Sequence, residues 1–151
     1  MIVYRVDFAA ADVDWQIQML MIYPEISNKH FYPAMHRAAN ALSGAIQPNI
    51  PRATGFLQSK FRKAVSGKGV FITAQVGFPN FSGVAYVIPL EYGAKPHEIG
   101  YVPSLDVSIR MHPGFLARKF MGHGFEQSQS QIETEMENGM RAVVNELAKD
   151  T

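Results

Sequence analysis

The chain contains no cysteine, and it has a single tryptophan among 151 residues. The lack of cysteine excludes disulfide bonds, thiolate catalysis and cysteine-ligated zinc or iron–sulfur sites. No apolar run is long enough to span a bilayer, and the N-terminal stretch lacks the basic and apolar regions of a signal peptide. We therefore expect a soluble protein made in the cytoplasm, with no membrane partner.

Acidic residues are missing from one long segment. Between Glu25 and Glu91 there is no aspartate or glutamate, whereas seven lysines and arginines lie there. From Glu126 onward the balance reverses and acids predominate. The net charge is only +1, so the composition gives no general signal for nucleic acid or membrane. Two interpretations stay open: the two signs form solvated or mutually neutralising faces, or the basic segment contacts DNA or another copy.

The sequence carries no recognisable catalytic motif: GxSxG, HExxH, phosphate-binding and dinucleotide-binding patterns are all missing. His97 and His112 flank an extended segment, with Glu91 nearby, and such side chains can ligate zinc. Their spacing matches no zinc motif, so we expect no catalytic residue, metal or cofactor, and we expect His112 to fix a turn. A small metal-dependent hydrolase or nuclease using Glu91, His97 and His112 stays open as the alternative.

A cellular nucleic-acid-binding module is a third possibility. Aromatic residues at Phe78, Phe81, Tyr86 and Tyr92 follow the basic segment, and aromatic and basic side chains together can bind single strands. Aromatic residues in a hairpin more often pack a core or a subunit interface.

Apolar periodicity predicts an α+β fold in a single domain, residues 1–151: a small, mainly antiparallel sheet packed against an N-terminal helix and a long C-terminal helix. Alternation predicts strands over 2–8, 70–78 and 84–93, the last two paired as a hairpin, and two short strands over 97–102 and 105–111. Helical spacing predicts helices over 24–46 and 121–147, and a short one from Thr54 to Val65 that ends at glycines. Asp12 or Asp14 is expected to cap one or two helical turns.

Three segments, "IPRATGFLQSKF", "YVIPLEYGAKPHEI" and "HPGFLARKFM", occur in this order before the last predicted helix. In this order they resemble the HK97 gp10-like family of tailed bacteriophages. The resemblance covers most of the chain and rests on Pro51, Thr54, Gly55, Leu57, Ser59, Glu91, Tyr92, Gly93, Pro96, His97, His112, Pro113, Gly114 and Phe120.

Two positions depart from the family's pattern. Ala53 stands where aspartate is usual, which removes a helix cap that Thr54 is expected to replace. Lys119 stands where proline is common, so a helix is expected to run unbroken through Phe120.

The resemblance implies a structural virion protein that joins head to tail, as a neck or tail-completion component, and "HPGFLARKFM" is then a structural hinge. Copies are expected to form a ring around the DNA passage and to contact other neck, connector or tail proteins and, non-specifically, packaged DNA. Assembly would take place in the cytoplasm of the bacterial host. The residues 94–111 are expected to order on docking. The contacts expected with the lumen or with a neighbouring subunit lie at Arg52, Lys60, Arg62, Lys63 and Lys68.

Overall fold

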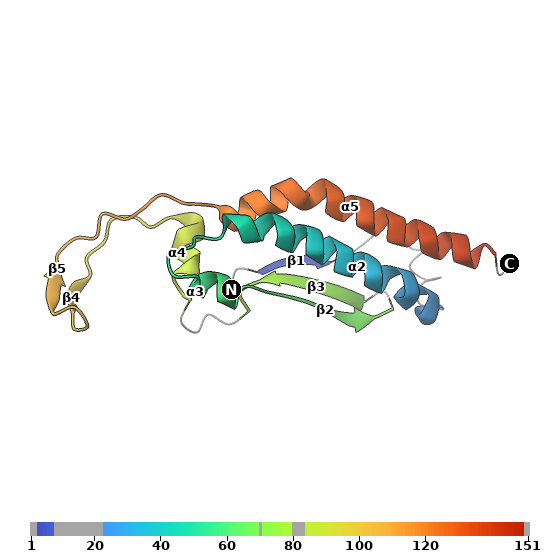
Figure 1. Ribbon diagram of the computed structural model, residues 1–151, viewed down its shortest axis with the longest axis horizontal. Coiled ribbons are helices and arrows are strands. Elements are labelled where there is room, and N and C mark those ends of the chain that lie inside the picture. Colours follow the sequence, from blue (N-terminus) through green and yellow to red (C-terminus); the bar gives the residue numbers. More distant parts are fainter. Residues whose placement is uncertain (1–2, 8–22, 70, 80–83, 150–151) are drawn as a thin grey trace.

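The computed structural model describes residues 3–7, 23–69, 71–79 and 84–149. In these residues, one long helix lies on a three-stranded antiparallel sheet, a second long helix packs beside the first, and a two-stranded ribbon extends away from them (Figure 1). The predicted α+β fold, with a small antiparallel sheet, an N-terminal helix and a long C-terminal helix, is confirmed. The turns predicted around Asp12 and Asp14 lie outside the described residues.

The sheet has the strand order β1-β3-β2, in which β1 is Val3–Asp7, β3 is Phe71–Gly77 and β2 is Arg62–Lys68. Alternate residues of β3 are buried, as its sequence predicts, and they form the face that packs on the helices: Ile72, Ala74 and Val76. The other face of β3 presents the exposed Phe71 and Gln75. One face of the sheet therefore belongs to the core, and the other is open.

The helix α2 spans Pro24–Ile46 and α5 spans Phe120–Leu147, and the two lie side by side (Figure 1). Pro24 occupies the first turn, where its missing N–H costs nothing. The predicted stripe on α2 is buried at every position: Phe31, Met35, Ala38, Leu42 and Ile46. On α5 the predicted stripe is buried at Met121, Ile132, Met136 and Val143 and half-buried at Phe125, Met140 and Leu147. The core is formed where these stripes meet β3.

Two predicted elements are wrong. The helix predicted from Thr54 to Val65 is only the short α3, Phe56–Lys60, and the following residues form β2, which pairs with β3 through the whole strand. The strand predicted over 84–93 is instead the helix α4, Val87–Tyr92. Its buried residues Val84, Val87 and Glu91 recur at helical spacing, and Pro89 falls in the first turn, where a helix tolerates it. The hairpin partner of β3 is therefore β2.

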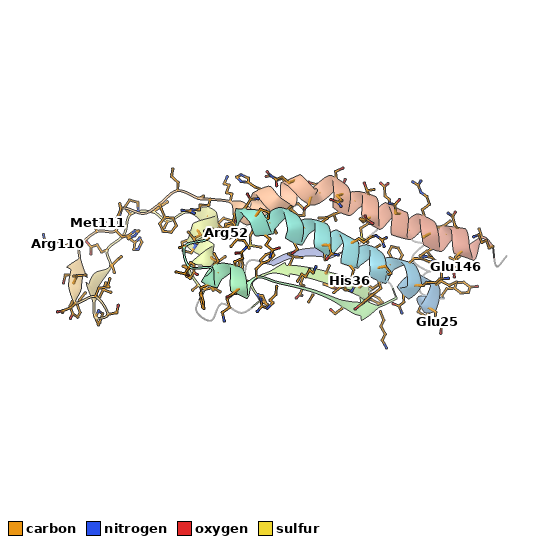
Figure 2. The ribbon with its side chains drawn as sticks, in the orientation of Figure 1. Glu25, His36, Arg52, Arg110, Met111 and Glu146 are labelled. Atoms are coloured by element: carbon orange, nitrogen blue, oxygen red, sulfur yellow. The ribbon has the colours of Figure 1, made fainter. Side chains whose placement is uncertain are left out.

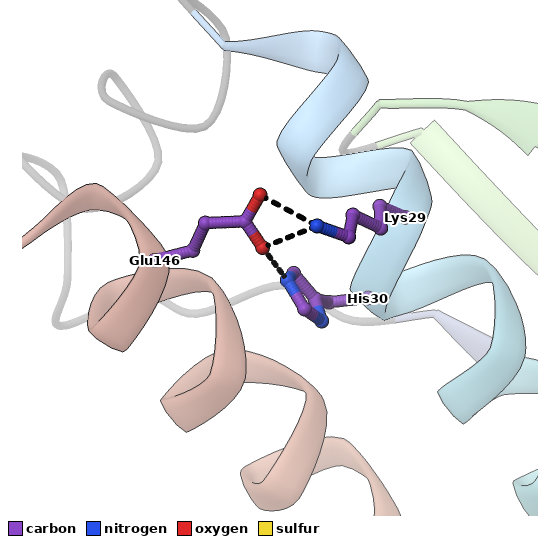
Figure 3. A network of polar contacts seen from close by, with 3 residues as sticks. All are labelled: Lys29, His30 and Glu146. Carbon is purple, nitrogen blue, oxygen red and sulfur yellow. Dashed lines mark hydrogen bonds and ion pairs between the residues drawn. The ribbon is translucent and has the colours of Figure 1, made fainter. Parts of the chain in front are cut away.

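A polar cluster joins the start of α2 to the end of α5 (Figure 3). Lys29 Nζ lies 2.8 Å and 3.0 Å from the two carboxylate oxygens of Glu146, and His30 Nε2 donates to the same carboxylate. The hydrogen bonds from Lys29 and then His30 lower the pKa of Glu146 from its ordinary value of 4.5. The contact favours the charged carboxylate and pins the C-terminal end of α5.

This lowered pKa predicts a pH-dependent stability. A carboxyl group whose pKa is lower in the folded state contributes stability fully above its unfolded value, 4.5, and loses it as the pH falls through the folded value. The unfolding temperature of the wild type should exceed that of Glu146→Gln at neutral pH, and the difference should shrink below pH 4.5. Thermal unfolding followed by circular dichroism between pH 7 and 3 measures this, with Glu98→Gln, at an exposed position outside the cluster, as the control. A difference that does not change with pH would contradict the assignment.

Candidate functional site

The ribbon that leaves the body is one long hairpin, which we call the arm, residues 94–115. Its short strands β4, Gly100–Val102, and β5, Val107–Ile109, pair antiparallel, with a turn between them. Isolated bridges join Ala94 to Phe115 and His97 to His112 in the same register as the strands. The two short strands predicted from the sequence are confirmed, and at about 3.3 Å per residue the arm extends roughly 30 Å from its base.

The arm extends beyond the helices and the three-stranded sheet, and its apolar side chains are exposed (Figures 1 and 2). Leu105 at the turn is 67% exposed, Tyr101 on β4 is 59% exposed and Met111 is 57% exposed. Val107 and Ile99 are exposed as well. A two-stranded ribbon is marginally stable alone in water, so an arm with these side chains is suited to contact with another molecule.

The base of the arm is held by a buried carboxylate. Glu91, in the last turn of α4, is 2% exposed, and its two oxygens accept hydrogen bonds from the backbone N–H groups of Met121 at 3.0 Å and Gly122 at 2.9 Å. These are free donors of the first turn of α5, where a negative charge is favoured by the helix dipole. The backbone also pairs here, because Arg118 N donates to Leu90 O and Lys119 N to Glu91 O. Glu91 therefore connects α4, the arm and α5.

The other residues of the predicted motifs shape this junction. Gly93 ends α4 with φ +81° and Gly114 has φ +75°, and a Cβ on Gly114 would lie 2.2 Å from Ala94 O, so both places require glycine. Phe120 begins α5 and is buried, whereas Tyr92 and Pro113 are exposed. The prediction that a helix runs unbroken through Phe120 is wrong. Lys119 precedes the helix in the left-handed conformation, with φ +48°, and it donates its N–H to Glu91 O.

The predicted approach of His97 and His112 is confirmed, since their rings stack with centroids 5.1 Å apart. His97 Nδ1 lies 2.8 Å from the carbonyl oxygen of Lys95, which can only accept, so this nitrogen carries a proton. His112 Nδ1 accepts from the backbone N–H of Gly114 at 3.0 Å, so the proton of its neutral ring is on Nε2. As predicted, His112 fixes the turn, and in this state neither of its nitrogens is left to ligate a metal.

Glu91 does not complete a metal site with this pair, because both of its oxygens face the start of α5. In the part of the chain that the structure describes, no three histidine, aspartate or glutamate side chains gather in a way that could hold a metal ion. Glu91, His97 and His112, the three residues of the alternative, therefore do not meet at one point.

The five basic residues predicted to make contacts lie on three successive segments: Arg52 in a loop, Lys60 at the end of α3, and Arg62, Lys63 and Lys68 on β2. Lys60 lies over the Phe56 ring at 5.1 Å, and Arg62 donates to the carbonyl oxygens of Ser59 and Phe61. Lys63 reaches Asn40 on α2, while Lys68 ends β2. Arg52 stands apart from them, in the loop before α3.

Arg52 lines an open cavity of about 450 Å³ between this loop, α4 and Arg118, which lies between the arm and α5. The predicted motif residues Pro51, Thr54, Gly55 and Leu57 line it too, with Tyr86 and Leu90. Thr54 Oγ1 accepts the N–H of Phe56 at 3.3 Å, so it satisfies one free donor of α3 as predicted, although Gly55 holds the N-cap position. Four of the five matched residues of this motif therefore line a cavity, and Ser59 does not.

The chain matches no known protein-family model, no curated protein and no solved structure. Among its described helices, none is both long and apolar enough to cross a membrane.

The sequence interpretation missed Arg118 and Tyr86 as partners of Arg52. The spacing of residues in the sequence does not predict this cavity, because the three residues come from separate parts of the chain. They are brought together by α4 and by the junction at Glu91.

Proposed function

We propose that the chain is a structural virion protein of a tailed bacteriophage, which joins head to tail as a neck or tail-completion component within an oligomeric ring around the DNA passage. The arm is the observation that carries this proposal. A rigidly held base and an exposed apolar hairpin suit a protein that works by docking onto others. The segment expected to order on docking lies within this arm, and it already has a continuous hairpin register.

The motif resemblance supports the same function, because the motif residues are concentrated in the structural parts of the molecule. Glu91 and Gly93 hold the base of the arm, while His97, His112 and Gly114 hold its register. These roles are positional rather than chemical, as an assembly protein requires. Other neck, connector or tail proteins are then the partners of the arm, and packaged DNA is a non-specific neighbour of the ring.

A gene disruption tests this function directly. A stop codon in the gene, placed in the phage or prophage genome that encodes the chain, should yield filled heads and tails that remain unjoined under the electron microscope. Supplying the wild-type gene on a plasmid should restore joined, infectious particles, and mass spectrometry should find the chain in them. Normal infectious particles without the chain would refute the proposal.

The arm gives a sharper prediction in the same assay. The triple variant Tyr101→Ser, Val107→Ser and Met111→Ser should keep the unfolding temperature of the wild type, because these side chains lie outside the core. It should fail to restore infectious particles, since each exposed anchor lost from a docking site can cost about 2 kcal/mol of binding.

Phe71→Ser is the matched control for this prediction. Phe71 is 75% exposed but lies on the open face of the sheet, away from the arm, and its variant should complement fully. Full complementation by the arm variant would show that these arm side chains are not needed for assembly.

A further inference from the structure

The cavity beside the arm contains two arginines without an acidic partner in the described part of the chain. Arg52 and Arg118 line it from opposite segments, and no described aspartate or glutamate forms an ion pair with either. The rest of the lining is mixed: Leu57 and Leu90 are apolar, whereas Thr54 and Tyr86 offer hydroxyl groups. A volume of about 450 Å³ exceeds what one small ion fills, so this cavity is suited to an acidic side chain with its hydrocarbon stem.

An acidic stripe on α5 has the complementary character. Glu126, Glu133 and Glu137 are separated by seven and four residues, and at about 100° per residue they fall within roughly 40° of one another on the helix. They extend over about 16 Å along the exposed side, opposite the buried stripe. The neighbouring acids Glu135 and Glu146 are already paired, with Arg37 at 2.5 Å and with Lys29 and His30.

These three acids cannot fill the cavity of their own chain. They lie on the outer side of α5, and in the described residues none forms an ion pair. Within the described parts of the chain, Glu133 alone of the three has a side-chain hydrogen bond, which it accepts from Gln129 at 3.0 Å, one turn away. Both halves of the complementary pair therefore remain available to a second molecule.

We propose that the cavity between Arg52 and Arg118 binds the Glu126–Glu133–Glu137 stripe of a second copy of this chain. This inference rests on the proposed function and deepens it, because it names the contact between neighbouring subunits. The cavity and the stripe are different surfaces, so the contact is head-to-tail and can close into a ring. Leu57 and Leu90 in the lining favour a glutamate stem over a DNA phosphate, which has no hydrocarbon part to cover them.

Charge reversal on each side tests the contact. One variant carries Arg52→Glu and Arg118→Glu, and the other carries Glu126→Lys, Glu133→Lys and Glu137→Lys. The wild type should self-associate, and salt should weaken the association. The association constant of each variant alone should fall at least roughly 30-fold, because like charges then face each other. Sedimentation velocity over a concentration series measures this, and circular dichroism verifies that the variants fold.

Mixing the two variants distinguishes this contact from a general charge effect. The acidic stripe of the first variant is complementary to the arginine cavity of the second, and the lysine stripe of the second is complementary to the glutamate cavity of the first. The mixture should therefore recover oligomers in which the two variants alternate. A chain carrying all five substitutions should recover the oligomers of the wild type. The control Arg110→Glu with Lys149→Glu, two exposed basic residues outside the cavity and the stripe, should associate like the wild type.

Three results would overturn the inference. These are a wild type that stays monomeric at every concentration, cavity and stripe variants that associate normally, and a cavity variant that loses only affinity for duplex DNA. None of them refutes the proposed function, which the gene disruption decides separately. Conversely, a confirmed contact in a chain whose loss leaves virions intact would refute the phage role and keep the contact.

Discussion

Glu91→Ala should lower the free energy of unfolding by about 3 kcal/mol, one of the largest effects expected of a single substitution in this chain. The substitution leaves the N–H groups of Met121 and Gly122 without their acceptors at a buried helix start. It also removes a negative charge from the positive end of the α5 dipole and opens a small void. Urea unfolding followed by circular dichroism measures the change.

Two variants separate the causes. Glu91→Gln keeps an oxygen acceptor but loses the charge, so it should cost about half as much. Glu98→Ala removes an exposed glutamate from the arm and should change the stability by less than about 0.5 kcal/mol. If Glu91→Ala proves as stable as the wild type, the two hydrogen bonds do not hold the base of the arm.

The helices and the core could be predicted because their signal is local. The stripes on α2 and α5 repeat with the helical period over many turns, and every tested position is buried or half-buried. The central strand β3 has an equally clear alternation, and its partner β1 does as well. In these elements the local preference and the tertiary environment favour the same structure.

The errors in the predicted secondary structure occur in short segments whose apolar residues fit both helical and strand periodicity. From Leu57 to Val65 apolar residues lie at helical spacing, yet the chain becomes extended at Phe61 because β3 offers a complete ladder of backbone partners. Around Pro89 the β-branched residues indicated a strand, whereas burial of Val84, Val87 and Glu91 on one side selects a helical turn. Contacts between distant segments decided both cases.

The candidate functional surfaces also differ in whether the sequence predicts them. The approach of His97 and His112 follows from a hairpin, and the acidic stripe can be found from the spacing of Glu126, Glu133 and Glu137 once the helix is assigned. The role of Glu91 could not be found, because a buried glutamate is recognised only when its donors on another helix are known. The cavity likewise depends on three segments that meet only in the folded chain.

Gly124→Val should also lower the free energy of unfolding by about 3 kcal/mol, because α2 and α5 touch at this residue. A Cβ at Gly124 would lie 2.5 Å from Ile46 Cγ1 and 2.9 Å from Ile46 Cα. The obstacle includes backbone, so a change of side-chain rotamer cannot relieve it and the helices must separate. Thermal and urea unfolding measure the loss.

Two other helical glycines give this prediction its controls. Gly44 on α2 has open space around it, so Gly44→Ala should stabilise the chain by about 0.5–1 kcal/mol through helix propensity alone. At Gly139 a Cβ would lie 2.8 Å from the Ala34 methyl, so the crowding there should exceed the gain in propensity, and Gly139→Ala should destabilise. Stabilisation by all three substitutions would mean that the helices are not closely packed. In the assembly that we propose, close packing fixes α5, and with it the acidic stripe, against the body that carries the arginine cavity and the arm.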